Sequence, residues 1–338
     1  MIQEAISRLV EGESLTTDEA AQVMNEIMEG EVTPAQFGAF VTALRFKGET
    51  VEEIAGFVKT MRAKAIPVLT KEPVVDVVGT GGDGMNTFNI STAAAFVVAG
   101  AGQKVAKHGN RAASSKCGAA DVLEALGVKF DLGPEEVQRC VEEVGIGFMF
   151  APAFHPAMKY AGPPRREIGI RTVFNIIGPL TNPAGARTYL LGVADTSLVE
   201  KLALVLQSLD CDHALVVHGE DGLDEISTTG KSHVCELKGG KIHTYTIEPG
   251  DFGLEKASLN DLKGSDAAEN AALLKDILSG KKGPQRDIVV LNAAAALVAS
   301  NKAKSIEEGI KMAIDSIDKG QAMDKLKRLV EFSQSFAV

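Results

Sequence analysis

Net positive charge is the first thing that this sequence of 338 residues lacks. Its 35 lysine and arginine residues stand against 45 aspartate and glutamate residues, and the formal net charge at pH 7 is −10. An acidic chain is a poor match for a non-specific nucleic-acid surface, although a local basic cleft is still compatible with it. We therefore expect no nucleic-acid partner.

Paired cysteines are also missing. The four cysteines are far apart in the sequence and no C-x-x-C pair occurs among them: Cys117, Cys140, Cys211 and Cys235. This spacing favours reduced thiols over a disulfide framework or a zinc site.

The sequence also shows no pattern typical of a signal peptide or a membrane-spanning helix. The first residues, Met1-Ile-Gln-Glu-Ala5, lack the basic and apolar regions of a signal peptide. The apolar run at Ile288–Ala299 has the length of a buried helix, which is too short to span a bilayer. These features predict a cytoplasmic protein with no membrane partner.

The N-terminal segment has the pattern of helices alone. Three capping-box sequences follow one another, starting at Thr16, Thr33 and Thr50. Apolar residues recur at helical spacing behind the second and third boxes. We predict a helical domain over residues 1–66, completed by part of residues 160–187. Such a small bundle buries little surface, so it should dock on the rest of the chain or on a second subunit.

From Pro73 onward, short β-branched runs alternate with helical patterns. The strand-like runs include Val74–Val78, Lys104–Ala106, Ile146–Phe150 and Tyr189–Ala194. This alternation predicts an α/β fold with a mainly parallel central sheet over residues 67–338. A Gly239-Gly240 pair between two further runs predicts a hairpin.

A glycine-rich loop follows the first of these strands. Four glycines occur within six residues, Gly79, Gly81, Gly82 and Gly84, and Asn89-Ile-Ser-Thr92 then opens an apolar helix. Glycine allows positive φ and lets backbone N–H groups approach a ligand. The N-terminus of a helix favours an anion. Strand, loop and helix together predict a phosphate site, while a glycine turn without a ligand is the simpler alternative.

Two common phosphate motifs do not account for this loop. The dinucleotide fingerprint needs a helix that opens directly from the glycines and an acidic residue after the next strand. Here the helix opens near Asn89, and the next strand runs into Lys107-His108. Gly79 and Gly84 have the spacing of a P-loop, but Met85 stands at the position of its lysine.

A basic cluster follows the second strand. Lys107-His-Gly-Asn-Arg111 should lie at the same sheet edge as the glycine loop, because carboxyl ends of parallel strands meet there. Ser114-Ser115 adds hydroxyl groups before the next helix. Cations from this cluster and the glycine loop suit a substrate with more than one phosphate, although a solvated basic surface is an alternative.

Four motifs in this order resemble the anthranilate phosphoribosyltransferase family: Gly79-Thr-Gly-Gly-Asp83, Asn89-Ile-Ser-Thr92, Lys107-His-Gly-Asn-Arg111 and Asn175-Ile-Ile-Gly-Pro-Leu-Thr-Asn-Pro183. The similarity runs from the N-terminal helices to the last helices. It implies transfer of phosphoribose from phosphoribosyl pyrophosphate (PRPP) to the amino group of anthranilate, in tryptophan biosynthesis. It also implies magnesium dependence and a homodimer that forms through the N-terminal helical domain.

The resemblance implies three sets of site residues. The set implied for PRPP is Gly79, Gly82, Asp83, Thr87, Asn89, Ile90, Ser91, Thr92, Lys107, His108, Gly109, Asn110, Arg111, Ala112, Ala113, Ser114, Ser115 and Ala119. The set implied for anthranilate is Gly79, Asn110 and Arg165, and the set implied for magnesium is Ser91, Asp224 and Glu225. Family members usually carry a serine where this chain has Ala119, which removes one hydroxyl contact to phosphate and leaves the backbone N–H.

Two of these assignments also have support from the residue types. Asp224-Glu225 follows a predicted strand, and magnesium takes carboxylate and hydroxyl oxygens. From the residues alone, a solvated acidic loop fits equally well. A carboxylate-bearing acceptor needs a planar cation, which the guanidinium of Arg165 supplies, while Arg166 suits the surface.

No arrangement of nucleophile, base and acid is apparent in the sequence, so we predict no acid–base residue and an electrostatic role for Lys107. Two alternatives stay open. A pyrimidine nucleoside phosphorylase resembles the same layout, but tends to have glycine at the position of Asn110 and does not need the Asp224-Glu225 pair. A non-catalytic nucleic-acid-binding relative would require a basic cleft.

Overall fold

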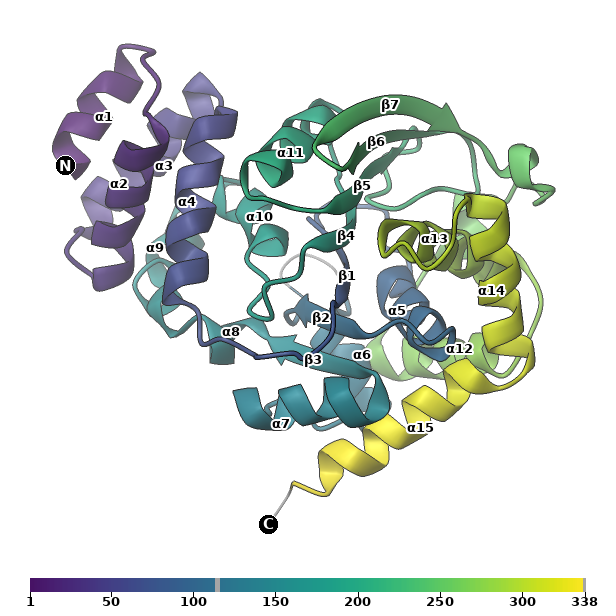
Figure 1. Cartoon of the computed structure of the whole chain (residues 1–338). Coiled ribbons are helices and arrows are strands. Elements are labelled where there is room, and N and C mark those ends of the chain that lie inside the picture. Colours follow the sequence, from purple (N-terminus) through teal and green to yellow (C-terminus); the bar gives the residue numbers. More distant parts are fainter. Residues whose placement is uncertain (113–115, 337–338) are drawn as a thin grey trace.

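The computed structural model describes residues 1–112 and 116–336. Four helices form an N-terminal bundle at one side of the molecule: α1 (Ile2–Val10), α2 (Thr17–Glu29), α3 (Pro34–Lys47) and α4 (Val51–Lys64) (Figure 1). The last three begin with complete capping boxes at Thr16, Thr33 and Thr50, each with both reciprocal hydrogen bonds. The sequence prediction of these three helix starts is confirmed.

The apolar faces of α3 and α4 are buried within the chain itself. The ring of Phe37 lies 5.5 Å from that of Phe174 in α10 (Phe174–Ile177). At the end of α4, Arg62 Nε donates to the carbonyl of Leu180 at 2.7 Å. The small bundle thus packs against the rest of the chain, which is one of the two partners expected for it. Phe46, at the end of α3, takes no part in this packing and is 95% exposed.

A seven-stranded sheet forms the centre of the larger part of the molecule. Its order is β3-β2-β1-β4-β5-β6-β7, with the first five strands parallel and the last two antiparallel. The strands are β1 (Val75–Gly79), β2 (Val105–Gly109), β3 (Ile146–Phe150), β4 (Thr188–Gly192), β5 (His213–Gly219), β6 (Ser232–Lys238) and β7 (Lys241–Ile247). Both the predicted fold class and the predicted β6–β7 hairpin are confirmed.

Helices cover both faces of this sheet (Figure 1). On one face α5 packs against α13, whose apolar residues are almost all buried, and α11 packs on the other face beside α4. The longer helices are α5 (Ile90–Gly100), α11 (Ser197–Ser208), α12 (Ala267–Leu278), α13 (Pro284–Ala299), α14 (Ile306–Asp318) and α15 (Gln321–Gln334). No helix within the described ranges is both long and apolar enough to cross a lipid bilayer.

Short helices connect the remaining parts. They are α6 (Ala119–Ala125), α7 (Pro134–Arg139), the π-helix η1 (Cys140–Val144), α8 (Ala151–Phe154), η2 (Pro156–Lys159), α9 (Gly162–Ile168), η3 (Gly178–Leu180), η4 (Pro249–Phe252) and η5 (Leu259–Leu262). Helix α7 continues without a break into the π-helix η1.

Strand β2 extends further than the sequence predicted. The expected strand stopped at Ala106, whereas β2 continues through Lys107 and His108 to Gly109, in register with β3. Polar side chains are tolerated in this buried strand because they have polar neighbours, as described below. The extension keeps the basic cluster at the carboxyl edge of the sheet, where Gly79 of β1 pairs with Gly192 of β4.

Candidate active site

The glycine loop leaves β1 at the carboxyl edge of the sheet. Gly81 and Gly82 have φ angles of +67° and +73°, which side chains other than glycine rarely adopt. The N–H of Gly81 donates to Asp224 Oδ2 at 2.6 Å. On its other side, the loop offers the carbonyls of Gly81 and Gly82 to the guanidinium of Arg171.

The acidic loop after β5 faces the glycine loop. Asp224 and Glu225 are half-buried there, and their loop is held by internal hydrogen bonds. Asp221 accepts hydrogen bonds from the hydroxyls of Ser227 and Thr229, both at 2.5 Å. Asp221 therefore has a scaffolding position in the loop, apart from the Asp224–Glu225 pair.

Asn292, in the middle of α13, holds the backbone of the same loop through two hydrogen bonds. Its side-chain oxygen accepts from the N–H of Ile226, and its Nδ2 donates to the carbonyl of Ile226, both at 2.9 Å. The side chain is fully buried. Residue 226 follows the acidic pair directly, so this clamp fixes the backbone beside both carboxylates.

Glycine at two strand ends allows the acidic loop to approach the sheet. A Cβ atom on Gly79 would clash with Asp224 Oδ2, and one on Gly192 would overlap the carbonyl oxygen of Asp224. Any side chain at either position would push Asp224 away. The sequence reasoning identified Gly79 through the glycine loop, but it missed Gly192.

Lys107 is almost completely buried between the two loops. Its Nζ donates to the carbonyl of Val77 and to Ser91 Oγ, the latter at 3.2 Å. Burial lowers the pKa of Lys107, and the negative charges of Asp76, Glu225 and Asp224 oppose that change. Burial likewise raises the pKa of Asp76 to about 6, while the charge of Lys107 acts in the other direction. These neighbours favour the charged ammonium of Lys107.

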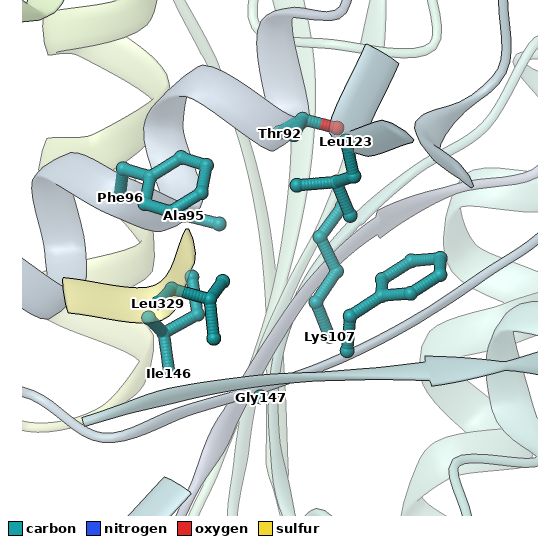
Figure 2. Close-up of a pocket in the computed structure, with 9 residues that line it drawn as sticks. Thr92, Ala95, Phe96, Lys107, Leu123, Ile146, Gly147 and Leu329 are labelled. Atoms are coloured by element: carbon teal, nitrogen blue, oxygen red, sulfur yellow. The ribbon is translucent and has the colours of Figure 1, made fainter. Parts of the chain in front are cut away.

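A small pocket beside Lys107 is lined mainly by apolar side chains (Figure 2). It lies where α5, β2, β3, α6 and α15 meet, with Thr92, Phe96, Leu123 and Leu329 around it. The hydroxyl of Thr92 is buried and has no hydrogen-bond partner within the described residues. We interpret the pocket as a packing gap behind the site, because it has little polar lining to recognise phosphate.

The start of α5 carries no side-chain cap. Asn89 turns away from it, with Nδ2 donating to the carbonyl of Cys117 and Oδ1 accepting from Asn270, both at 3.1 Å. The backbone of Ser91 lies near the carboxylate of Glu225 and lowers its pKa, against the larger effect of burial, which raises it. Ile90 is buried in the core.

The acidic pair is an incomplete set of metal ligands. Burial raises the pKa of Asp224 to about 6, with the charge of Asp83 adding to the effect, and burial together with Asp224 raises the pKa of Glu225 well above its usual range. No three His, Cys, Asp or Glu side chains in residues 1–112 and 116–336 form a group able to hold a metal. Magnesium is usually held by one or two carboxylates plus water and substrate phosphates, so two carboxylates near Ser91 fit that ion.

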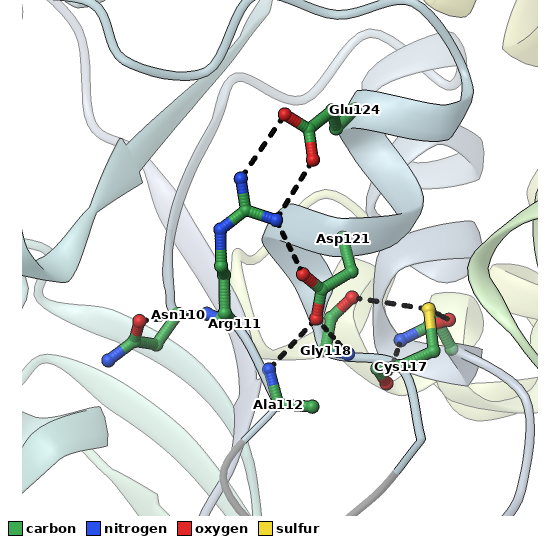
Figure 3. Close-up of polar contacts among 8 residues, drawn as sticks. Asn110, Arg111, Ala112, Cys117, Gly118, Asp121 and Glu124 are labelled. Carbon is green, nitrogen blue, oxygen red and sulfur yellow. Dashed lines mark hydrogen bonds and ion pairs between the residues drawn. The ribbon is translucent and has the colours of Figure 1, made fainter.

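Arg111 does not face the glycine loop through its guanidinium. It pairs with Asp121 at 2.7 Å and with Glu124 at 2.9 Å, both on α6 (Figure 3). The other oxygen of Asp121 accepts from the N–H groups of Ala112 and Gly118, both at 2.9 Å. Asp121 thus links the two ends of the connection between β2 and α6. Ala113, Ser114 and Ser115 of this connection lie outside the described residues.

The remaining residues predicted for PRPP are spread around this edge. Asn110 is exposed, and its side-chain oxygen accepts from the N–H of Arg111 at 2.8 Å. Ala119 begins α6, with its Cβ facing the position of Gly109. Thr87 forms an isolated antiparallel bridge with Lys263, which ties the end of the glycine loop to the segment before α12.

Arg165 lies on α9, half-buried, with its guanidinium 5.2 Å from the ring centre of Phe174. Burial lowers its pKa, and no carboxylate opposes that shift. A half-buried guanidinium on an aromatic ring without an anionic partner in the described residues is suited to binding a ligand carboxylate.

His108 and His155 form a second unpaired polar group. Their ring centres are 5.1 Å apart, and both Nε2 atoms are buried with no hydrogen-bond partner among residues 1–112 and 116–336. Burial lowers the pKa of His108 to about 3 and that of His155 to about 4. Both imidazoles are therefore neutral at pH 7.

Sequence comparisons match this architecture in two parts. Residues 3–65 match the helical bundle domain of a glycosyl transferase family, and residues 71–323 match the a/b domain of the same family. The anthranilate phosphoribosyltransferase of Dehalococcoides mccartyi (strain ATCC BAA-2266 / KCTC 15142 / 195) is 60% identical over 339 residues, covering 100% of this chain and 99% of its own.

Solved structures give the same result. The crystal structure of anthranilate phosphoribosyltransferase from Thermus thermophilus has a TM-score of 0.93 and 45% identity, covering 98% of this chain and 99% of its own. The Saccharomyces cerevisiae enzyme in complex with PRPP and Mg has a TM-score of 0.90 and 31% identity, covering 99% of this chain and 98% of its own. A further yeast structure contains 4-fluoroanthranilate. This chain belongs to the anthranilate phosphoribosyltransferase family.

Proposed function

We propose that this protein transfers the phosphoribosyl group of PRPP to the amino group of anthranilate, giving N-(5-phosphoribosyl)anthranilate and pyrophosphate in tryptophan biosynthesis. The observation that carries the proposal is the meeting of the glycine loop, Lys107 and the Asp224–Glu225 pair at one sheet edge. The identity of 60% to a curated family member over the full chain supports it. The yeast enzyme with PRPP and Mg supports the choice of donor and ion.

The donor is held by its phosphates. The glycine loop, the start of α5 and Lys107 supply N–H groups and positive charge, and Asn110 and Ala112 lie in the connection that follows β2. When bound, magnesium held by Asp224, Glu225 and the hydroxyl of Ser91 supplies further positive charge to the pyrophosphate oxygens. Preorganised charge of this kind stabilises a leaving group as its own charge grows.

The acceptor is held by its carboxylate. Arg165 offers two parallel N–H donors, which match the two oxygens of a carboxylate in one plane. As the bond between the anomeric carbon and pyrophosphate breaks, its electron pair leaves with pyrophosphate, and the lone pair of the amine forms the new C–N bond. The amine then loses one proton. Binding both substrates in this geometry does most of the work, because the amine is already a neutral nucleophile.

The domain division and the assembly belong to the same proposal. We place the helical domain at residues 1–66, with part of residues 160–187, and the α/β domain at residues 67–338. The homodimer would form through the N-terminal helices, where Phe46 and Val10 are exposed by 95% and 73%. Light scattering that finds a monomer at micromolar concentration would reject the dimer.

A fluorescence assay of anthranilate consumption tests the function directly. With PRPP and magnesium the signal of anthranilate should fall, and removal of magnesium by a chelator should slow the reaction strongly. A folded protein that leaves anthranilate unchanged, but releases free base from a pyrimidine nucleoside with phosphate, would establish the phosphorylase alternative instead.

A further inference from the structure

Arg171 makes an unusual contact for a surface arginine. It lies between α9 and α10, and its guanidinium donates to two successive carbonyls of the glycine loop. Nη1 lies 2.6 Å from the oxygen of Gly82, and Nη2 lies 3.1 Å from the oxygen of Gly81. No carboxylate competes for this guanidinium among the described residues, so the loop backbone is its partner.

Because peptide units are planar, this contact also fixes the direction of the N–H groups in the same peptides. In a trans peptide the carbonyl of one residue and the N–H of the next point in opposite directions, and the described residues contain no cis peptide. The carbonyls of Gly81 and Gly82 point to Arg171, so the N–H groups of Gly82 and Asp83 point away from it. Neither N–H has a partner within the described residues.

Glycine itself explains why such a clamp is needed. Gly81 and Gly82 adopt positive φ angles, and glycine has more conformational freedom to lose than any other residue. The fit is close, because a Cβ on Gly82 would lie 2.5 Å from Nη1 of Arg171. Asp224 holds the N–H of Gly81 at the same time. The loop is therefore fixed by an arginine through its carbonyls and by a carboxylate through one N–H.

We propose that Arg171 is a positioning residue for the donor site, which holds the glycine loop so that the N–H groups of Gly82 and Asp83 are directed at the phosphates of PRPP. This inference rests on the proposed function for the identity of the donor. Arg171 acts through the loop backbone, and its distance in sequence from Gly82, 89 residues, explains why the glycine motif alone did not reveal it.

The test compares Arg171→Ala and Arg171→Lys with Arg166→Ala, a matched control on the neighbouring exposed arginine. Calorimetry with PRPP and magnesium, together with steady-state kinetics, measures both substrates. Loss of two charge-assisted hydrogen bonds should raise the Kd and KM for PRPP about tenfold in Arg171→Ala. The KM for anthranilate should change less than about twofold. Arg171→Lys should recover part of the loss, since an ammonium can hold one carbonyl but not both in a fixed plane.

Backbone amide exchange in the free protein gives a readout that needs no substrate. Peptides covering residues 79–88 should exchange faster in Arg171→Ala and unchanged in Arg166→Ala. Unchanged exchange and unchanged PRPP affinity would overturn the proposal, and so would a rise in the KM for anthranilate alone, which would make Arg171 a carboxylate ligand. If Arg171→Ala does not fold, Arg171→Lys carries the same test. A wild-type protein that does not bind PRPP would refute the proposed function, while the exchange experiment would still decide the clamp.

Discussion

The two halves of the site differ in how far their polar groups are satisfied inside the protein. In the donor half, the glycine loop and the acidic loop hold each other through Gly81 and Asp224, and Arg171 and Asn292 clamp one loop each. In the acceptor half, the guanidinium of Arg165 packs on Phe174 and has no anionic partner within the described residues.

Under the proposed function, this contrast follows from what each half would bind. A flexible glycine loop needs internal hydrogen bonds, because unfixed N–H groups would lose conformational entropy each time a ligand bound. A single guanidinium packed on Phe174 is already fixed by the ring, so its charge can be left for the ligand. We expect the donor half to depend on loop geometry and the acceptor half to depend on one charge.

The largest effect should come from the donor half, when its acidic pair is neutralised. Asp224→Asn together with Glu225→Gln keeps the shape of both side chains and removes both charges. Turnover should fall at least about a hundredfold, because the positive charge of magnesium beside the leaving pyrophosphate lowers the barrier by several kcal/mol. Steady-state kinetics measure this loss.

Circular dichroism and melting temperature serve as the check on folding, and Glu220→Gln, on the exposed neighbour in the same loop, is the matched control. Activity within about threefold of the wild type would contradict the metal assignment, since that corresponds to less than about 1 kcal/mol.

The sequence predicted the parts of this site that lie close together in the chain. The first strand, the glycine loop and the opening of α5 follow one another within residues 74–92, and glycine, polar and apolar residues mark each boundary. The parallel sheet then explained why Lys107 should meet that loop. Local pattern and sheet topology were sufficient for the fold and for the position of Lys107, whereas the Asp224–Glu225 pair was assigned by family resemblance, because the residues alone fitted a solvated acidic loop equally well.

The clamps and the close approaches could not be predicted in this way. Asn292 binds the backbone of a residue 66 positions away, and any buried asparagine in an apolar helix looks alike in sequence. Gly192 is a strand end whose need for glycine depends on the position of Asp224. Arg111 belongs to the basic motif, yet its guanidinium forms ion pairs with Asp121 and Glu124. These pairs depend on how α6 packs, which the sequence motif does not reveal.

A smaller effect is expected when the acceptor half loses its charge. Arg165→Ala should raise the KM for anthranilate about ten- to a hundredfold, because a charge-assisted pair is worth about 1.5–3 kcal/mol. The KM for PRPP should move much less, and Arg165→Lys should recover only part of the loss. Steady-state kinetics with each substrate varied in turn measure both constants.

Arg166→Ala, on the exposed neighbour, should leave both constants unchanged. The comparison between the halves fails if Arg165→Ala acts mainly on PRPP, because Arg165 would then be a phosphate ligand.

The smallest effect concerns the buried His108–His155 pair, and it appears in the pH dependence of stability. His155 has a folded-state pKa of about 4, lowered mainly by burial, against about 6.5 in an unfolded chain. Between these values the unfolded chain binds a proton that the folded protein does not, so the free energy of unfolding falls as pH falls through this window, and the loss is absent above about pH 6.5.

His155→Gln removes this titration, so the free energy of unfolding of the variant should fall less steeply between pH 6.5 and 4.5, by up to about 1.4 kcal/mol per pH unit. His108 and Asp76 titrate in both proteins, and the charge of His155 that lowers the pKa of His108 is mostly absent above pH 4.5, so the difference in slope comes mainly from His155. Urea unfolding at several pH values measures the slope, with His243→Gln on an exposed residue as the control. Equal slopes for His155→Gln and the wild type would mean that His155 becomes charged in the folded protein as readily as in the unfolded chain, and the surroundings of the His108–His155 pair would then be more solvated than its unpaired nitrogens indicate.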